Sequence, residues 1–211
     1  MTPEAPPARR VLLLAGCFAD AVPSMGLAVA LASRMRARLE GVLALDPRAE
    51  AAALVTIGPR GRAGPAPAGA PLRLACAADA RAFRQRLHVA AAGASLPWSF
   101  RIATGLPSEL ALGLRQPGDL VVLGHRRFLS LRGPLVSLAG SDSEPTALLA
   151  ADLARVLGLR LRRLPVDTPP SEIKMLAASA LVLPRGFGET LPSLNMLMDA
   201  VRCPLLLDAV D

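Results

Sequence analysis

The chain has 211 residues, of which 52% are hydrophobic and 19% are charged, and its formal net charge is +7. This length and hydrophobicity suffice to bury a full core, which excludes a disordered chain and indicates one large or two small globular domains. The chain has no Tyr, one Trp and five Phe, so the stacking aromatics that usually accompany a basic nucleic-acid surface are missing. No run approaches the ~18 uncharged apolar residues of a membrane span. We therefore expect neither a nucleic-acid nor a membrane partner.

An apolar run near the start imitates a bacterial lipoprotein signal. Two arginines precede the run VLLLAGC, which ends at Cys17. The run is short against the ~7–15 residues of a usual signal core. Its Leu-Ala-Gly ending also recurs in the middle of the chain, at residues 138–140. We interpret the run as a strand rather than as a signal.

The cysteines indicate the compartment. Cys17, Cys76 and Cys203 are an odd number and lack both a CxxC motif and the spacing of metal ligands. Such use of cysteine is typical of a reducing compartment. We expect a cytoplasmic protein without a metal site.

In chain order, the first half alternates strands and helices. Strands are predicted over residues 10–16, 41–45, 98–103 and 119–123, and helices over 25–39, 77–92 and 106–115. The strand at 119–123, DLVVL, shows no alternation, so we expect a central parallel strand that is buried on both faces. Residues 58–71, GPRGRAGPAPAGAP, have a low-complexity composition that cannot pack a core and are predicted to form a disordered loop.

The second half begins with the clearest unit of the chain. A strand is predicted over 135–139, a turn with N-cap residues over 140–144, a helix from Pro145 to the stop at Gly158, and a strand over 159–166. A helix over 171–178, a strand over 180–183, a helix over 191–201 and a terminal strand over 204–207 follow. Alternating helices and buried strands predict an α/β fold with a doubly wound, parallel, Rossmann-like sheet.

The openings of the two halves are alike. In each, a strand ends in Leu-Ala-Gly, a helix carries a Leu-Ala pair, and a second strand ends in Asp, at Asp46 and Asp167. The offset of roughly 121 to 124 residues indicates an internal duplication. We predict two fused repeats, 1–133 and 134–211, with the second one shortened.

Three short motifs support a family resemblance. They are GDLVVLG at 118–124, ALVL at 180–183 and RCPLLL at 202–207. In their order and spacing they resemble the universal stress protein family, whose repeat closes with a DLIVMG strand, a glycine-rich loop, a helix and a CPVLVV strand. The resemblance covers most of the chain as two copies, of which the first lacks its own closing helix and fifth strand. It implies a doubly wound sheet and a role in stress response or regulation.

The chain departs from the nucleotide-binding pattern of that family. Members that bind ATP or AMP place an Asp after the first strand, where this chain has Ala15 and Ala139. Their phosphate loop, Gly-x2-Gly-x9-Gly-Ser/Thr, is interrupted by Arg127 in the first copy and begins with Pro184 in the second. The resemblance therefore implies a degraded nucleotide motif.

Candidate site residues lie after the predicted strands. A glycine followed by cations can bind an anion, and a glycine-rich turn or a helix N-terminus can do so through backbone N–H groups. The candidates for binding a phosphate or another anion are Gly124, His125, Arg126, Arg127, Gly140, Ser141, Gly186 and Gly188. Their alternative interpretations are a solvated loop, an N-cap and turn glycines. Because the sequence shows no Ser/His/Asp set, zinc site or P-loop, we expect no enzyme.

Three hypotheses of function follow. The leading one is a non-catalytic stress-response or regulatory protein without a cofactor, which acts by association with a partner protein that the sequence does not identify. The alternative is a module that binds ATP, AMP or another anion. The third is an enzyme of the same architecture, such as a nucleotidyl-transferring or electron-transfer relative.

The terminal strand predicts the mode of self-association. Pro204 to Leu207 would leave an open apolar edge unless that edge is covered or paired. In the resembled family this strand commonly pairs across a dimer interface. We therefore expect a homodimer through 204–207.

Overall fold

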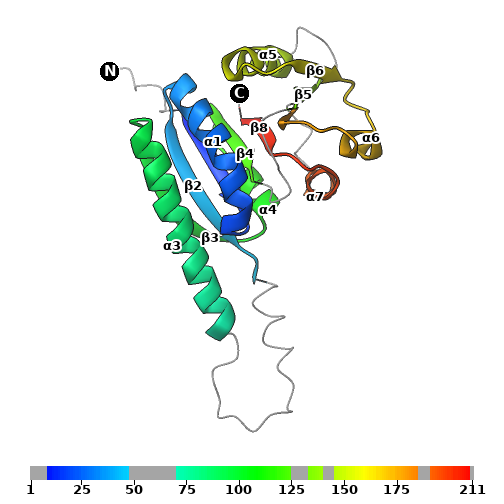
Figure 1. Cartoon of the computed structure of the whole chain (residues 1–211). Coiled ribbons are helices and arrows are strands. Elements are labelled where there is room, and N and C mark those ends of the chain that lie inside the picture. Colours follow the sequence, from blue (N-terminus) through cyan, green and yellow to red (C-terminus); the bar gives the residue numbers. More distant parts are fainter. Residues whose placement is uncertain (1–8, 48–69, 125–132, 140–144, 185–190, 210–211) are drawn as a thin grey trace, which may run out of the picture.

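The computed structural model describes residues 9–47, 70–124, 133–139, 145–184 and 191–209. Within them, eight strands form one sheet in the order β3-β2-β1-β4-β8-β7-β5-β6. Figure 1 shows the course of the chain through the sheet and its helices. The strands are β1 (Arg10–Ala15), β2 (Arg38–Leu45), β3 (Trp98–Thr104), β4 (Asp119–Leu123), β5 (Leu135–Leu138), β6 (Leu161–Leu164), β7 (Ala180–Leu183) and β8 (Leu205–Ala209). Every pair is parallel except β4 with β8.

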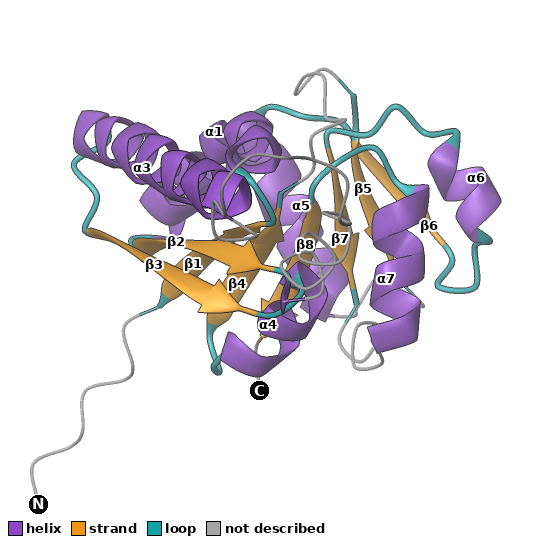
Figure 2. Ribbon diagram, turned by 90° about the horizontal axis from the view of Figure 1, so that it is seen from below, coloured by secondary structure: helices purple, strands orange, loops and turns teal. Residues whose placement is uncertain are grey.

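Helices cover both faces of this sheet. They are α1 (Phe18–Met35), α3 (Ala70–Gly93), α4 (Pro107–Leu114), α5 (Pro145–Leu157), α6 (Pro170–Lys174) and α7 (Leu191–Ala200). One core lies under α1, α3 and α5, and a second lies under α4, α6 and α7. Figure 2 shows α1 and α3 on one side of the sheet and α4 on the other. The predicted doubly wound α/β fold is confirmed, with one antiparallel pair in a sheet that we expected to be parallel throughout.

Burial on both faces explains the composition of the central strands. In β1, Val11 and Leu13 belong to the core under α1, whereas Leu12 and Leu14 belong to the core under α4. All five residues of β4 are buried, as the absence of alternation in DLVVL predicts. These strands are apolar at every position because neither face meets water.

Helix α1 differs from its prediction at both ends. It begins at Phe18, seven residues before the predicted start, and continues through Pro23. It ends at Met35, because Arg36 adopts a left-handed conformation with φ of 51° and caps the helix without a glycine. Leu39, predicted as the last helical residue, is buried in β2 instead.

The predicted C-terminal bound of the loop over 58–71 is wrong. Helix α3 already begins at Ala70, seven residues before its predicted start, so the last two residues of the predicted loop are helical. The remaining residues of that loop lie outside the described ranges.

The second half has shorter elements than its sequence predicts. Strand β6 spans four residues rather than the predicted 159–166, and α6 spans five residues rather than 171–178. The order of its strands in the sheet nevertheless follows that of the first half. In each half the first strand lies between the second strand and the later buried strand, as β1 lies between β2 and β4, and β5 between β6 and β7.

The predicted open edge at Pro204–Leu207 is wrong. Strand β8 lies inside the sheet, where Leu206 is in register with Val122 of β4 on one side and with Val182 of β7 on the other. Because both of its neighbours belong to the same chain, β8 cannot pair with a second copy in this arrangement. The described sheet ends at β3 and β6 instead. The predicted pairing through 204–207 is thus excluded in this arrangement, and homodimerisation itself stays a prediction.

Candidate functional site

A cavity of about 510 Å³ opens at the carboxyl ends of β1, β2 and β3. The loop after β1, the first turns of α3 and the start of α4 complete its wall. Its lining residues are Gly16, Cys17, Ala44, Leu45, Asp46, Pro47, Leu72, Ala75, Cys76, Ala77, Asp79, Ile102, Thr104 and Pro107. Open α/β sheets bind their ligands outside the carboxyl ends of the strands, near the point where the strand order reverses. Here that point lies between β1 and β4, directly beside the cavity.

Two carboxylates give this cavity its charge. Asp79 on α3 accepts a hydrogen bond of 3.1 Å from the backbone N–H of Phe18, the first residue of α1. It thereby does the work of a helix cap, because the N-cap residue Cys17 makes no side-chain hydrogen bond to the helix. Asp46 directly follows the last residue of β2. Among the described lining residues there is no Lys, Arg or His, so the described wall disfavours anions.

The thiols of Cys17 and Cys203 are not activated for nucleophilic attack. Burial raises the pKa of the Cys17 thiol, and the nearby Asp20 carboxylate raises this pKa further. Burial also raises the pKa of Cys203 to about 12. A thiol must lose its proton before it attacks a substrate, and a raised pKa keeps both thiols protonated at neutral pH.

The site predicted after β4 can be compared with the structure at one residue. Gly124 donates its backbone N–H to the carbonyl of Leu14 over 2.7 Å, so this N–H is not free for a ligand. A Cβ at Gly124 would lie 2.6 Å from the carbonyl oxygen of Asp20, so the position requires glycine for packing against α1. The other candidates, His125, Arg126, Arg127, Gly140, Ser141, Gly186 and Gly188, lie outside the described residues.

The sheet topology separates these candidates into two groups. Strand β8 runs antiparallel to β4 and parallel to β7, which is parallel to β5. The carboxyl end of β4 therefore points in one direction, and the carboxyl ends of β5 and β7 point in the opposite direction. The stretch that begins at Gly124 therefore leaves the sheet on the other side from the stretches that follow Leu138 and Leu183. Two separate sites, rather than one composite site, are compatible with this arrangement.

Sequence reasoning missed the cavity. Cys17, Cys76 and Asp79 line it together, although helix α1 and strand β2 separate the first of them from the other two along the chain. One signal was present, since an acidic residue that ends the second strand of a βαβ unit commonly binds ribose hydroxyls. Asp46 occupies this place, but the sequence analysis used it only as evidence of a repeat.

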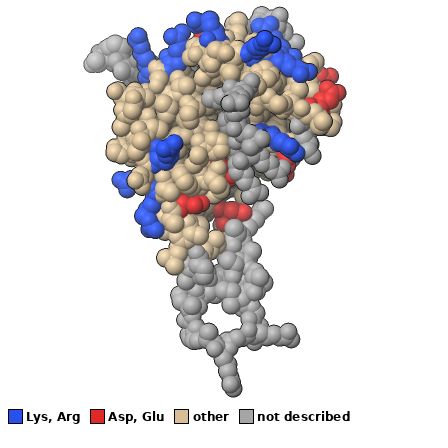
Figure 3. All heavy atoms as spheres, viewed as in Figure 1, with Lys and Arg blue, Asp and Glu red and all other residues tan. Residues whose placement is uncertain are grey.

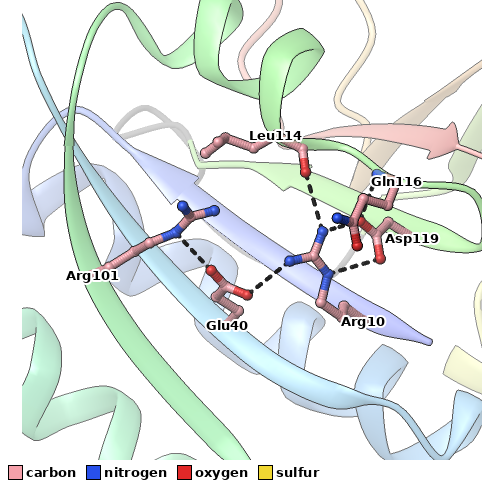
Figure 4. A network of polar contacts seen from close by, with 6 residues as sticks. All are labelled: Arg10, Glu40, Arg101, Leu114, Gln116 and Asp119. Carbon is pink, nitrogen blue, oxygen red and sulfur yellow. Dashed lines mark hydrogen bonds and ion pairs between the residues drawn. The ribbon is translucent and has the colours of Figure 1, made fainter. Parts of the chain in front are cut away.

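A second polar cluster lies at the other end of the strands (Figure 4). Arg10 of β1 donates to Asp119 of β4 at 2.5 and 3.0 Å, to Glu40 of β2 at 3.2 Å, and to the carbonyl of Leu114 at 3.1 Å. Arg101 of β3 contacts the second oxygen of Glu40 at 2.7 Å. The hydrogen bond to Asp119 is the main cause that raises the pKa of Arg10. With every member paired, this network joins four strands and has a structural role.

Two classes of site were also sought in the described ranges. No group of three or more His, Cys, Asp and Glu side chains there has an arrangement that could hold a metal ion. None of the helices in the same ranges combines the length and the hydropathy needed to cross a bilayer.

Comparisons with known proteins were made for sequence and structure. No family model matches the sequence, and no curated protein matches it either. A universal stress protein of Burkholderia pseudomallei is 15% identical over 96% of each chain, with a TM-score of 0.36. UspA of Lactobacillus plantarum is 17% identical over 76% of this chain and 99% of its own, with a TM-score of 0.38. A universal stress protein of Archaeoglobus fulgidus is 8% identical over 95% and 96% of the two chains, with a TM-score of 0.40. The chain is thus similar to solved structures of the family that its sequence resembles.

Proposed function

We propose that the protein is a non-catalytic stress-response or regulatory protein whose first half binds a small ligand in the cavity at the ends of β1, β2 and β3. The observation that carries this proposal is the cavity itself. Its volume of about 510 Å³ lies within the ~300–1,000 Å³ of usual ligand sites. Its apolar walls with a few polar groups are also typical of such sites.

The chemistry of the wall favours a nucleoside over a nucleotide. Asp46 has the position from which acidic residues accept hydrogen bonds from ribose hydroxyls. Ala44, Leu72 and Ile102 supply apolar surface for a flat base. A phosphate chain beside Asp79 would meet a carboxylate, and no described lining residue is a cation, so the described wall disfavours a phosphate chain. This selectivity agrees with the degraded phosphate loop of the sequence.

The absence of catalysis is part of the proposal. In the mechanism, the two carboxylates accept hydrogen bonds and the apolar wall excludes water, while the Cys17 thiol stays protonated. No cofactor is required. The occupied protein then acts through a partner protein in the cytoplasm, as the leading hypothesis from the sequence has it.

Thermal unfolding with millimolar ligands tests this proposal. The ligands are adenosine, AMP, cyclic AMP and ATP, each with and without magnesium. A ligand that binds only the folded state at ~100 times its dissociation constant adds about 2.7 kcal/mol of stability. We expect the largest shift with adenosine, a smaller one with AMP or cyclic AMP, and the smallest one with ATP.

A matched pair of variants locates the binding. Ala75→Phe places a ring in the cavity, whereas Ala78→Phe places the same ring on an exposed position of α3 that does not line it. The adenosine shift should disappear in the first variant and persist in the second. If ATP gave the largest shift and Ala75→Phe left it unchanged, the predicted anion site that begins at Gly124 would replace the cavity. If no compound raised the midpoint of thermal unfolding, the proposal that the cavity binds a small ligand of this kind would be wrong.

A further inference from the structure

Strand β3 is one end of the described sheet, and no other described strand pairs with its outer edge. Between β2 and β3, the N–H of Leu39 donates to the carbonyl of Pro97 and the N–H of Gly105 donates to the carbonyl of Leu45. In a parallel pair, alternate residues of one strand direct both backbone groups to the same neighbour. The odd-numbered residues of β3 therefore bond to β2. Phe100, Ile102 and Thr104 direct their N–H and C=O groups outward.

A groove of about 340 Å³ runs between this edge and helix α3. Its lining residues are Ala80, Arg81, Arg84, Phe100, Arg101 and Ile102. Ile102 is half exposed, at 50%, beside this strand edge. The edge thus offers backbone hydrogen bonds and an apolar contact side by side.

The groove is basic. Three of its six lining residues are arginines and none is acidic. Arg101 is held by Glu40, whereas Arg81 and Arg84 form no ion pair with any acid in the described part of the chain. Figure 3 shows basic side chains along the side of the molecule where α3 lies. Two exposed guanidinium groups beside a free edge favour a partner that brings carboxylates.

We propose that β3 docks an extended acidic segment of a partner protein, which adds to the sheet as a further strand. The N–H and C=O groups of Phe100, Ile102 and Thr104 bind the backbone of the segment, and Arg81 and Arg84 bind its carboxylates. Alternate residues of a strand face the same side of a sheet, so the segment needs an acidic residue at every second position. This inference names the partner class and does not depend on the ligand of the cavity.

The charges argue against other occupants. A second copy that paired through β3 would bring the arginines of both chains together, and like charges across an interface disfavour association. A nucleic acid would need exposed aromatic side chains for stacking, but Phe100 packs on Phe83 and Trp98 on His88, with ring centroids 5.3 and 5.2 Å apart. An acidic peptide can form hydrogen bonds with the backbone edge of β3 and ion pairs with Arg81 and Arg84.

The test uses the full chain and a fluorescein-labelled peptide of eight residues in which Glu and Val alternate. Binding is followed by fluorescence anisotropy. Arg81→Glu combined with Arg84→Glu should weaken binding at least tenfold. Ile102→Pro removes an outward N–H without breaking the ladder to β2 and should weaken binding by a similar factor. The matched control Ile102→Val keeps that N–H and should bind as the unmodified chain does.

A second measurement needs no variant, so it does not depend on whether Ile102→Pro folds. On addition of the peptide, hydrogen exchange should slow at the amides of Phe100, Ile102 and Thr104 and stay unchanged at Ser99 and Arg101, which already bond to β2. A peptide of the same composition with all its Glu residues in one block tests whether alternation matters, and it should bind at least tenfold more weakly.

Several results would overturn the proposal. One is unchanged exchange at the three outward amides with saturating peptide. Another is equal binding of the alternating and block peptides, which would indicate attraction by charge alone. A third is a concentration-dependent dimer, measured by light scattering, that Arg81→Glu with Arg84→Glu strengthens, because a second copy would then be the occupant. Tighter binding of a single-stranded oligonucleotide than of the peptide would assign the groove to nucleic acid. Because Ile102 lines both the groove and the cavity, the test of independence is the Arg81→Glu with Arg84→Glu variant, which should lose peptide binding and keep nucleoside binding.

Discussion

The two halves of the sheet share one arrangement of strands but differ in the elements that they add to it. Between β2 and β4 the first half inserts the long helix α3 and strand β3, and these elements build both the cavity and the basic groove. Between β6 and β7 the second half has only the five-residue helix α6. In return the second half supplies β8, the strand that covers β4 of the first half. The first half is therefore the one equipped for binding, and the second half completes its sheet.

The halves also differ in how they use charge. In the first half, Arg10, Glu40 and Asp119 are largely buried, with side-chain exposures of 15%, 10% and 3%. In the second half, the ion pair of Asp152 and Arg155 lies on the surface of α5, with exposures of 50% and 68%. Buried pairs are costly to break and exposed pairs contribute little, so the same substitution should have unequal effects in the two halves.

Arg10→Ala should have the largest effect. It leaves the buried carboxylates of Asp119 and Glu40 without their shared cation, and breaking a buried pair costs ~3–5 kcal/mol. The free energy of unfolding is measured by urea titration. Trp98, the single tryptophan, reports on the first half by fluorescence, and alkylation of the buried Cys203, followed by mass spectrometry, reports on the second.

Arg155→Ala is the matched control for this prediction. It should lower the free energy of unfolding by no more than ~0.5 kcal/mol, because its ion pair is exposed. If Trp98 and Cys203 report the same midpoint for Arg10→Ala, the β4–β8 pair joins both halves into one cooperative unit. Midpoints that differ would show that the halves unfold separately. Equal losses for the two substitutions would contradict the contrast in burial.

High pH should destabilise the second half through Cys203. The ordinary pKa of a thiol is 9.0, and burial raises that of Cys203 to about 12. The folded protein therefore retains this proton where the unfolded chain has lost it, so stability is unaffected below pH 9 and falls as the pH rises from 9 towards 12. At pH 10.5 the loss should be about 2 kcal/mol relative to pH 8.

Few other groups obscure this effect, since the chain has no Tyr and a single Lys. The measurement is urea unfolding at pH 8 and pH 10.5, with Cys203→Ala as the control. The control should be less stable than the unmodified chain at pH 8 and should lose much less stability on the change to pH 10.5. An equal loss in both proteins would assign the pH dependence to other groups, of which Cys17 is the first candidate because its pKa is also raised.

Two glycine substitutions should have small effects of opposite sign. A Cβ at Gly26 in α1 or at Gly158 after α5 would meet no atom within 4 Å, so sterics do not distinguish the two positions. Gly158 has φ of +65°, so Gly158→Ala should cost ~1–2 kcal/mol. Gly26 lies in a regular, exposed part of its helix, so Gly26→Ala should add ~0.5–1 kcal/mol. The measurement is the midpoint of thermal unfolding. Shifts of the same sign would contradict the role given to backbone conformation.

The sequence predicted those parts of the fold whose cause is local. Strands β4 and β7 were found because burial on both faces leaves an unbroken apolar run, and α5 was found from its apolar spacing and its glycine stop. The end of α1 was missed because Arg36 reverses the chain without a glycine. The place of β8 was missed because its partner β4 lies far away in the sequence, and nothing in Pro204–Leu207 distinguishes an edge strand from a central one.

The candidate site was harder to predict. A cavity depends on which strand ends meet, and only the folded sheet brings Cys17 and Asp46 together with Cys76. The residues singled out from the sequence were chosen for their chemical type after predicted strands. Of these, Gly124 is explained by its close approach to Asp20.

The pairing of β8 with β4 has a consequence for synthesis in the cell. Strand β8 follows β4 by more than 80 residues in the chain, so the edge of β4 stays uncovered until Leu205–Ala209 has left the ribosome. At usual rates of translation this interval is on the order of ten seconds. An apolar strand such as β4 is prone to aggregate while its edge is open. The nascent chain thus passes through a vulnerable stage in which a chaperone has time to act, and a premature stop codon before β8 would make that stage permanent.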